Sequence, residues 1–121
     1  MNTSKDMVQV AFKALDEKLA ADINVIDISK VSDVADYFLI ATGNSANQVQ
    51  AIADNVEEKM GRAGYDLRQI EGYQSARWIL MDYHDIVIHI FYQEDRHFYN
   101  LERIWRDGKF MDVEELRAEA E

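Results

Sequence analysis

The stretch Arg77-Trp-Ile-Leu-Met-Asp82, Tyr83-His84, Asp85-Ile-Val-Ile-His-Ile-Phe91 decides the fold of this chain. Two apolar runs, rich in β-branched and aromatic residues, flank a short polar break, which is the pattern of a β-hairpin. We expect Tyr83 and His84 to form a two-residue loop. The cross-strand pairs are then Asp82 with Asp85, Leu80 with Val87, and Trp78 with His89.

The two faces of this hairpin differ in chemistry, because side chains alternate along a strand and cross-strand partners share a face. One face is wholly apolar and is expected to be core: Ile79, Met81, Ile86, Ile88 and Ile90. The other carries Trp78, Leu80, Val87 and His89, with Asp82 and Asp85 at the turn end. This second face is either covered by another element or is a docking surface with a Trp anchor and an acidic rim. A three-residue loop would exchange the two faces.

Length and composition limit the class of protein. The 121 residues are 48% hydrophobic, enough for one domain with a core, and the absence of cysteine excludes disulfides and thiolate sites. No signal peptide and no apolar run near the roughly 18 residues of a membrane span are visible, which predicts a soluble cytoplasmic protein. The net charge of −10 and the lack of a basic stripe favour a basic protein partner over direct nucleic-acid readout.

The pattern of apolar residues in the N-terminal half predicts two helices and two strands. Apolar residues at helical spacing indicate a helix over 4–21, with Val8, Ala11, Leu15 and Leu19 on one stripe. Residues 23–28 form a short strand, and the continuous apolar run 37–42 indicates a strand buried on both faces. A second helix begins at a capping box of Ser45 and Gln48 and runs to about residue 61. Its apolar stripe contains Val49, Ile52, Ala53, Val56 and Met60.

The C-terminal half adds a short strand over 65–71, the hairpin, and a helix around residues 98–105. Residues 1–110 are therefore expected to form a single domain, and 111–121 a charged, solvated tail. The order α-β-β-α-β-β-β-α predicts an α+β fold, in which helices lie mainly on one face of a mixed sheet. The opposite face of the sheet is then partly open.

Enzyme chemistry has weak support in the sequence. The junction Gly43-Asn44-Ser45 could hold an anion on backbone amides, but a glycine followed by a capping serine is usually a plain helix start. A nucleotidyltransferase needs a pair of carboxylates alternating on a strand to hold its metals, and the strand after Asp85 offers no second one. His84, His89 and His97 lack zinc-ligand spacing. We expect no catalytic, metal or cofactor site.

One ordered set of segments stands out in the chain: Asp36–Ser45, Gln48–Ala53, Glu71-Gly72, Trp78–Tyr83, Val87–Phe91, and Arg96–Glu102 with Trp105. Together these segments resemble the ribosomal silencing factor family, also called Iojap-like or RsfS. The resemblance spans about residues 7–107 and departs mainly at His84, where many members have glycine.

This resemblance implies a nucleotidyltransferase-like fold without the enzyme's metal carboxylates. It also implies that the protein binds the large ribosomal subunit through the basic ribosomal protein L-fourteen, blocks joining of the small subunit and represses translation. With the face argument, it suggests these partner-binding residues: Gly72, Tyr73, Trp78, Leu80, Asp82, Asp85, Val87, His89, Arg96 and Tyr99. Glu102 also matches a family position.

Three alternatives stay open at this stage. The chain could be a divergent nucleotidyltransferase using the Gly43–Ser45 junction, or a factor in large-subunit assembly. It could also form a homodimer through the Trp78 face, which docking would not exclude.

Overall fold

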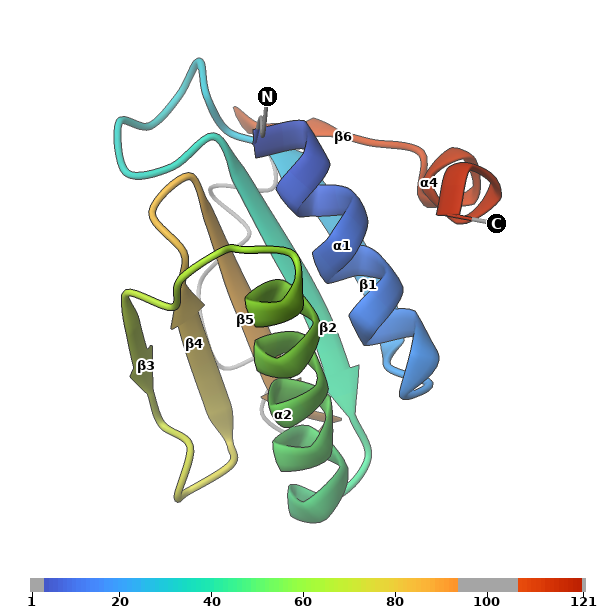
Figure 1. The fold of residues 1–121 in the computed structure, drawn as a ribbon, viewed down its shortest axis with the longest axis vertical. Coiled ribbons are helices and arrows are strands. Elements are labelled where there is room, and N and C mark those ends of the chain that lie inside the picture. The colour runs from blue at the N-terminus through green and yellow to red at the C-terminus, as the bar shows by residue number, and fades with distance from the viewer. Residues whose placement is uncertain (1–3, 94–106, 121) are drawn as a thin grey trace.

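One mixed sheet organises the molecule. The computed structural model describes residues 4–93 and 107–120. Within these residues, six strands form a sheet in the order β3-β4-β5-β2-β1-β6, as Figure 1 shows. The elements are α1 (Ser4–Glu17), β1 (Ala21–Asp27), β2 (Tyr37–Gly43), α2 (Ala46–Arg62), β3 (Gln69–Glu71), β4 (Trp78–Asp82), β5 (Ile86–Tyr92), β6 (Lys109–Phe110) and α4 (Val113–Ala120). Strands β2 and β5 are parallel and the other neighbours antiparallel, which confirms the expected fold class.

The helices gather on one side of the sheet. Figure 1 shows α1 and α2 side by side in front of the strands, with α4 beside α1. The larger hydrophobic cluster lies between these helices and the sheet, and all of the expected α2 stripe belongs to it. Ile79, Ile86 and Ile88 of the hairpin are fully buried in the same cluster, so the predicted core face is confirmed.

The start of α2 has the predicted cap. The Ser45 hydroxyl accepts a hydrogen bond from the Gln48 backbone N–H at 3.0 Å. The Gln48 side chain accepts from the Asn44 N–H at 2.7 Å rather than from the Ser45 N–H, and its amide donates to the Lys18 and Leu19 carbonyls. Gln48 therefore holds the backbone just before the N-cap of α2 and also joins this helix to the end of α1.

Two element boundaries differ from the sequence prediction. Helix α1 ends at Glu17, because Leu19 lies in the left-handed region at φ +58° and turns the chain toward β1. Leu19, expected on the buried stripe, is consequently 82% exposed. The strand predicted over 65–71 is confined to Gln69–Glu71, although Leu67 still contacts the core.

The hairpin has a different register but the predicted faces. Its pairs are Trp78 with Phe91, Leu80 with His89, and Asp82 with Val87, and the Tyr83 N–H donates to the Ile86 carbonyl. The two-residue loop is thus His84-Asp85, one position later than expected. Each β4 residue pairs with a residue two positions further along β5 than expected. A shift by an even number leaves the alternation of side chains unchanged, so each residue keeps its face.

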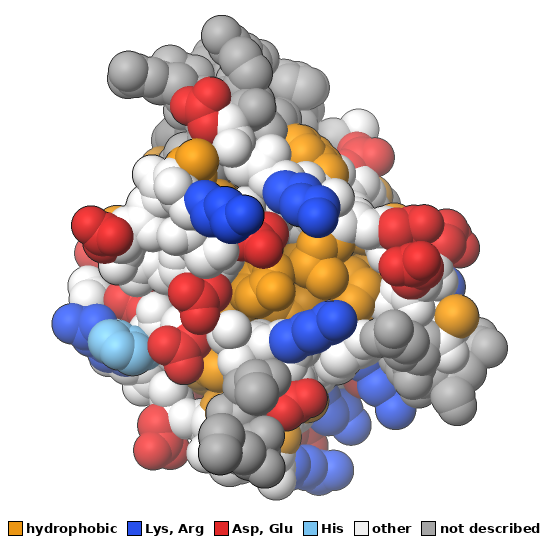
Figure 2. Space-filling model, turned by 90° about the horizontal axis from the view of Figure 1, so that it is seen from above, with side chains coloured by type: hydrophobic (Ala, Val, Ile, Leu, Met, Phe, Trp, Pro, Cys, Tyr) orange, Lys and Arg blue, Asp and Glu red, His pale blue; other side chains and the backbone are white. Residues whose placement is uncertain are grey.

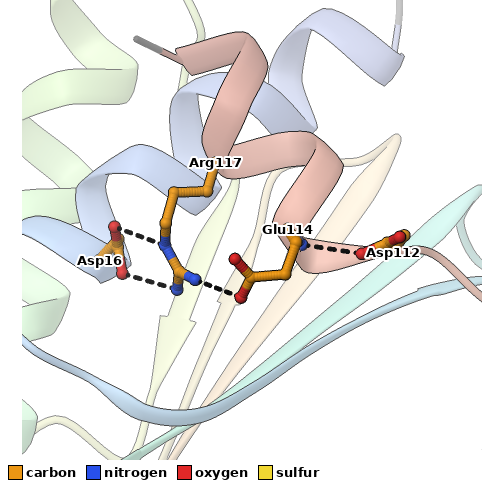
Figure 3. Close-up of polar contacts among 4 residues, drawn as sticks. All are labelled: Asp16, Asp112, Glu114 and Arg117. Atoms are coloured by element: carbon orange, nitrogen blue, oxygen red, sulfur yellow. Dashed lines mark hydrogen bonds and ion pairs between the residues drawn. The ribbon is translucent and has the colours of Figure 1, made fainter.

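The C-terminal segment is not the solvated tail that its charges suggest. Strand β6 pairs with β1, and α4 follows it with Leu116 only 2% exposed in the main core. Figure 3 shows Arg117 of α4 between Asp16 of α1 and Glu114, with contacts of 3.1 and 2.6 Å. Asp112 caps α4 by accepting from the Glu114 N–H. The charges of this segment therefore pair with α1 and cap α4. The helix expected around 98–105 lies outside the described residues.

We predict that Val56→Ala lowers the free energy of unfolding by about 1–3 kcal/mol, because it removes buried methyl groups and leaves a cavity between α2 and the sheet. Chemical denaturation measures this loss. Glu57→Ala, the next residue on the exposed side of α2, is the matched control and should change stability little. An unchanged free energy of unfolding for Val56→Ala would contradict the packing of α2 in the core.

A second prediction concerns His84, which has φ +76° and carries the turn hydrogen bond between the Asp85 N–H and the Tyr83 carbonyl. A β-carbon is strained at positive φ by about 1–2 kcal/mol, and glycine avoids this at an entropic cost of about 0.5–1 kcal/mol. His84→Gly should therefore raise the free energy of unfolding by up to about 1 kcal/mol. His84→Ala, which also loses the Arg68 contact but keeps the β-carbon, should not stabilise; a gain there would exclude strain as the cause.

Candidate functional site

The predicted docking residues of β4 form a stripe along one strand. Trp78, Leu80 and Asp82 point to the same side of the sheet and are all partly exposed, whereas Ile79 and Met81 between them are buried. We call Trp78, Leu80 and Asp82 the β4 stripe. It lies one strand away from the edge of the sheet, where the neighbouring β3 is only three residues long.

The next strand inward offers less surface than the sequence suggested. Val87 and His89 of β5 are 5% and 3% exposed, and Phe91 is fully buried. The expected open face is therefore closed at its centre, and Val87 and His89 lie beneath the surface rather than on it. Val87 belongs to a second hydrophobic cluster on this side of the sheet, whose fully buried members include Ile26, Ile28, Ile40 and Phe91, and the His89 ring contacts Phe38 and Phe91 of the same cluster.

Trp78 is held by contacts with two rings of β5. Its indole stacks on Phe91 with the ring centres 5.4 Å apart, and lies 5.8 Å from the His89 ring. Its Nε1–H donates a hydrogen bond of 3.0 Å to His89 Nδ1. One side of the indole thus rests on the sheet while part of the ring is accessible, which is the arrangement expected of an anchor.

His89 is an uncharged part of this cluster. Burial lowers the pKa of His89 to about 4, because the apolar surroundings disfavour the imidazolium. Phe38 of β2 meets the ring edge-on, with centres 4.7 Å apart. At neutral pH the imidazole is therefore neutral and can accept the hydrogen bond from Trp78.

Gly72 has a structural reason to be near this site. It has φ +78°, and a β-carbon added there would lie 2.1 Å from the Trp78 carbonyl oxygen. Only glycine allows the loop after β3 to pass so close to the start of β4. Tyr73 faces the other way: its hydroxyl donates to the Asp54 carboxylate of α2 at 2.9 Å, which raises the pKa of Tyr73. The structure thus brings Gly72, but not Tyr73, to the β4 stripe.

The acidic end of the stripe lies at the β4–β5 turn. Asp82 accepts a hydrogen bond of 2.8 Å from the His84 N–H, so its carboxylate also supports the turn. Asp85 is exposed, and its carbonyl accepts from the Asp36 N–H. Figure 2 looks onto this end of the molecule and shows acidic and basic side chains interspersed around a central apolar area, with basic side chains directly beside it. The predicted residues Arg96 and Tyr99, like Glu102, lie outside the described residues.

The junction before α2 has the contacts of a helix start. The Asn44 N–H donates to the Gln48 side chain, and the Gln48 N–H donates to the Ser45 hydroxyl. A β-carbon on Gly43 would lie 2.8 Å from Val49 Cγ2. Gly43 therefore allows α2 to pack closely on the sheet. Among residues 4–93 and 107–120, no group of three His, Asp or Glu side chains could hold a metal ion.

No helix in the described part of the chain is both long and apolar enough to span a bilayer.

Sequence reasoning missed two features of the site. It placed Trp78 opposite His89, which in the observed register is its diagonal neighbour, and it did not foresee their hydrogen bond. The available signal was that both positions lie on the same face of the predicted hairpin. The contact between Gly72 and the Trp78 carbonyl had no sequence signal beyond the glycine itself.

Comparison with known proteins agrees with the resemblance. A family model described as "RsfS: Ribosomal silencing factor during starvation" matches residues 1–121. The ribosomal silencing factor RsfS of Bacillus subtilis is 42% identical over 110 residues, covering 91% of this chain and 93% of that protein. A crystal structure from Chromobacterium violaceum has a TM-score of 0.82 at 33% identity and covers 87% of both chains. One from Bacillus halodurans has a TM-score of 0.80 at 36% identity, covering 89% of this chain and 98% of that one. Because the family model spans the full sequence and the relatives match nearly all of it, this chain belongs to the ribosomal silencing factor family.

Proposed function

We propose that this protein binds the large ribosomal subunit through ribosomal protein L-fourteen and thereby prevents the small subunit from joining. Membership of the silencing factor family supports this function. The β4 stripe is the observation that links this function to particular residues. There, an aromatic and an aliphatic side chain remain partly exposed beside a carboxylate.

The β4 stripe has the composition of an interface centre. Trp78 presents a large, rigid surface whose orientation is already set by Phe91 and His89, so little side-chain entropy is lost on binding. Leu80 extends the apolar surface along the strand. Interface energies concentrate at such anchors, so we assign the main contact to Trp78 and Leu80, supported from beneath by the buried Val87 and His89.

Charge complementarity supports a basic partner. The chain has a net charge of −10, and Asp82 and Asp85 lie at the turn end of the stripe. Opposite potentials accelerate encounter and select against wrong partners, while exposed charges add less to the final affinity. The resemblance implies that L-fourteen is basic, which suits this end of the molecule.

The proposed mechanism is steric occlusion and needs no chemistry. A protein seated on the surface that the small subunit requires blocks joining in proportion to its occupancy. We therefore propose a regulator rather than an enzyme, acting where ribosomes are, in the cytoplasm. The capped start of α2 and the single carboxylate of the Asp85 strand support this proposal over a nucleotidyltransferase.

We predict that Trp78→Ala weakens binding to purified large subunits by about thirtyfold or more, because a central anchor commonly contributes 2 kcal/mol or more. A binding titration with labelled protein measures the change. Phe110→Ala is the matched control: Phe110 is a 49% exposed aromatic residue on β6, at the opposite edge of the same sheet, and its loss should leave affinity unchanged.

Circular dichroism and sedimentation of the free variants complete this test. If folded Trp78→Ala binds like the parent protein, Trp78 is not the anchor and the proposed face is wrong. If the parent is a dimer and Trp78→Ala a monomer with unchanged subunit binding, the stripe serves self-association instead.

A further prediction separates charge from contact. Asp85→Lys should reduce affinity for large subunits more at low salt than at high salt, because screening weakens the interaction of exposed charges. Asp85 is a better probe than Asp82, whose carboxylate also holds the turn. Glu57→Lys makes the same charge change on the exposed side of α2 and should have a smaller effect. Equal losses for the two variants would show that only net charge matters.

A further inference from the structure

The hydrogen bond between Trp78 and His89 determines which nitrogen of the imidazole carries the proton. The indole Nε1–H can only donate, so His89 Nδ1 must accept and the proton of the neutral ring must be on Nε2. His89 Nε2 is itself buried and finds no hydrogen-bond partner among the described residues. The contact with Trp78 is therefore made while a second polar group of the same ring is left unsatisfied.

Stability alone does not account for a histidine at this position. A buried donor without an acceptor is unfavourable, and an apolar side chain of similar size would avoid that penalty. The neighbours of His89 favour such a replacement, since Phe38 and Phe91 surround the ring and Leu80 is its cross-strand partner. What histidine provides, and leucine could not, is an acceptor aimed at the indole nitrogen of Trp78.

We propose that His89 is a positioning residue for docking: its Nδ1 holds the Trp78 indole in the orientation that the partner recognises. This inference rests on the proposed function and extends it to a buried residue that does not reach the surface. Stacking on Phe91 fixes the plane of the indole, and the hydrogen bond fixes its direction within that plane. A partner then binds a ring that is already oriented, which lowers the entropic cost of association.

The experiment compares two variants of the full chain. His89→Leu introduces an apolar side chain of similar size and removes the acceptor, whereas His89→Asn places an amide oxygen near the position of Nδ1. Loss of one hydrogen bond that orients the anchor corresponds to about three- to tenfold in affinity. We expect His89→Leu to be at least as stable as the parent and to bind large subunits three- to tenfold more weakly. His89→Asn should bind nearly as well as the parent despite lower stability, which a purely structural role would not produce.

The unmodified protein provides a second readout that does not require any variant to fold. In nitrogen-15 NMR, His89 should be the Nε2–H tautomer, and the indole proton of Trp78, assigned from through-space contacts to the His89 and Phe91 rings, should exchange slowly with solvent. A protonated Nδ1 or a rapidly exchanging indole proton would overturn the proposal.

Binding data separate failure of this inference from failure of the proposed function. If Trp78→Ala loses binding while His89→Leu binds like the parent, docking stands and the positioning role is wrong. If Trp78→Ala itself binds normally, the docking site is wrong, and the positioning role has no function to serve. Equal weakening by His89→Leu and His89→Asn also contradicts the proposal, because the acceptor would then have no effect.

Discussion

The parallel pairing of β2 with β5 is the constraint on which the rest of the structure depends. The two strands pair along their whole length, from Tyr37 with Ile86 to Gly43 with Tyr92, and nearly all of their residues are buried. Parallel strands cannot be joined by a tight turn and need a long crossover. Here the crossover contains α2, β3 and β4, so this one pairing places α2 over the sheet and adds the hairpin strand beyond β5.

Exposure differs between neighbouring strands on the second face of the sheet. Strand β5 has neighbours on both sides, and its residues are buried up to Phe91. Strand β4 has β5 on one side and only the short β3 on the other, so its alternate residues stay partly accessible. The partly exposed Trp78 therefore lies on a strand that is paired on both sides, which keeps its backbone in place while part of its side chain stays accessible.

Several residues with positive φ and an unsatisfied buried polar group lie next to β4. Gly72, Ala76 and His84, which precede and follow this strand, all have positive φ, and the buried Nε2 of His89 lies under the stripe. Such features persist only where the surrounding structure imposes them, and they are common where function competes with stability. The core on the helix side is packed largely with aliphatic side chains, and its buried Asn55 donates to the Ala14 carbonyl. The two sides of the sheet thus differ in composition.

By itself, the sequence determined the elements whose signal is local and periodic. The α2 stripe, the Ser45 cap, the buried run of β2 and the two faces of the hairpin were all predictable, because helical spacing and strand alternation directly encode which side chains are buried. The tertiary structure alone decided the hairpin register, since His84 adopts a positive φ that its residue type does not favour. It also decided how residues 109–120 are placed. Their charges predict a solvated tail, but Leu116 packs in the main core and Arg117 pairs with Asp16 of α1. The tertiary structure likewise decided the burial of Val87 and His89 and the hydrogen bond from Trp78 to His89. They depend on which strands meet across the sheet, and contacts between residues far apart in the chain leave no periodic trace in one sequence.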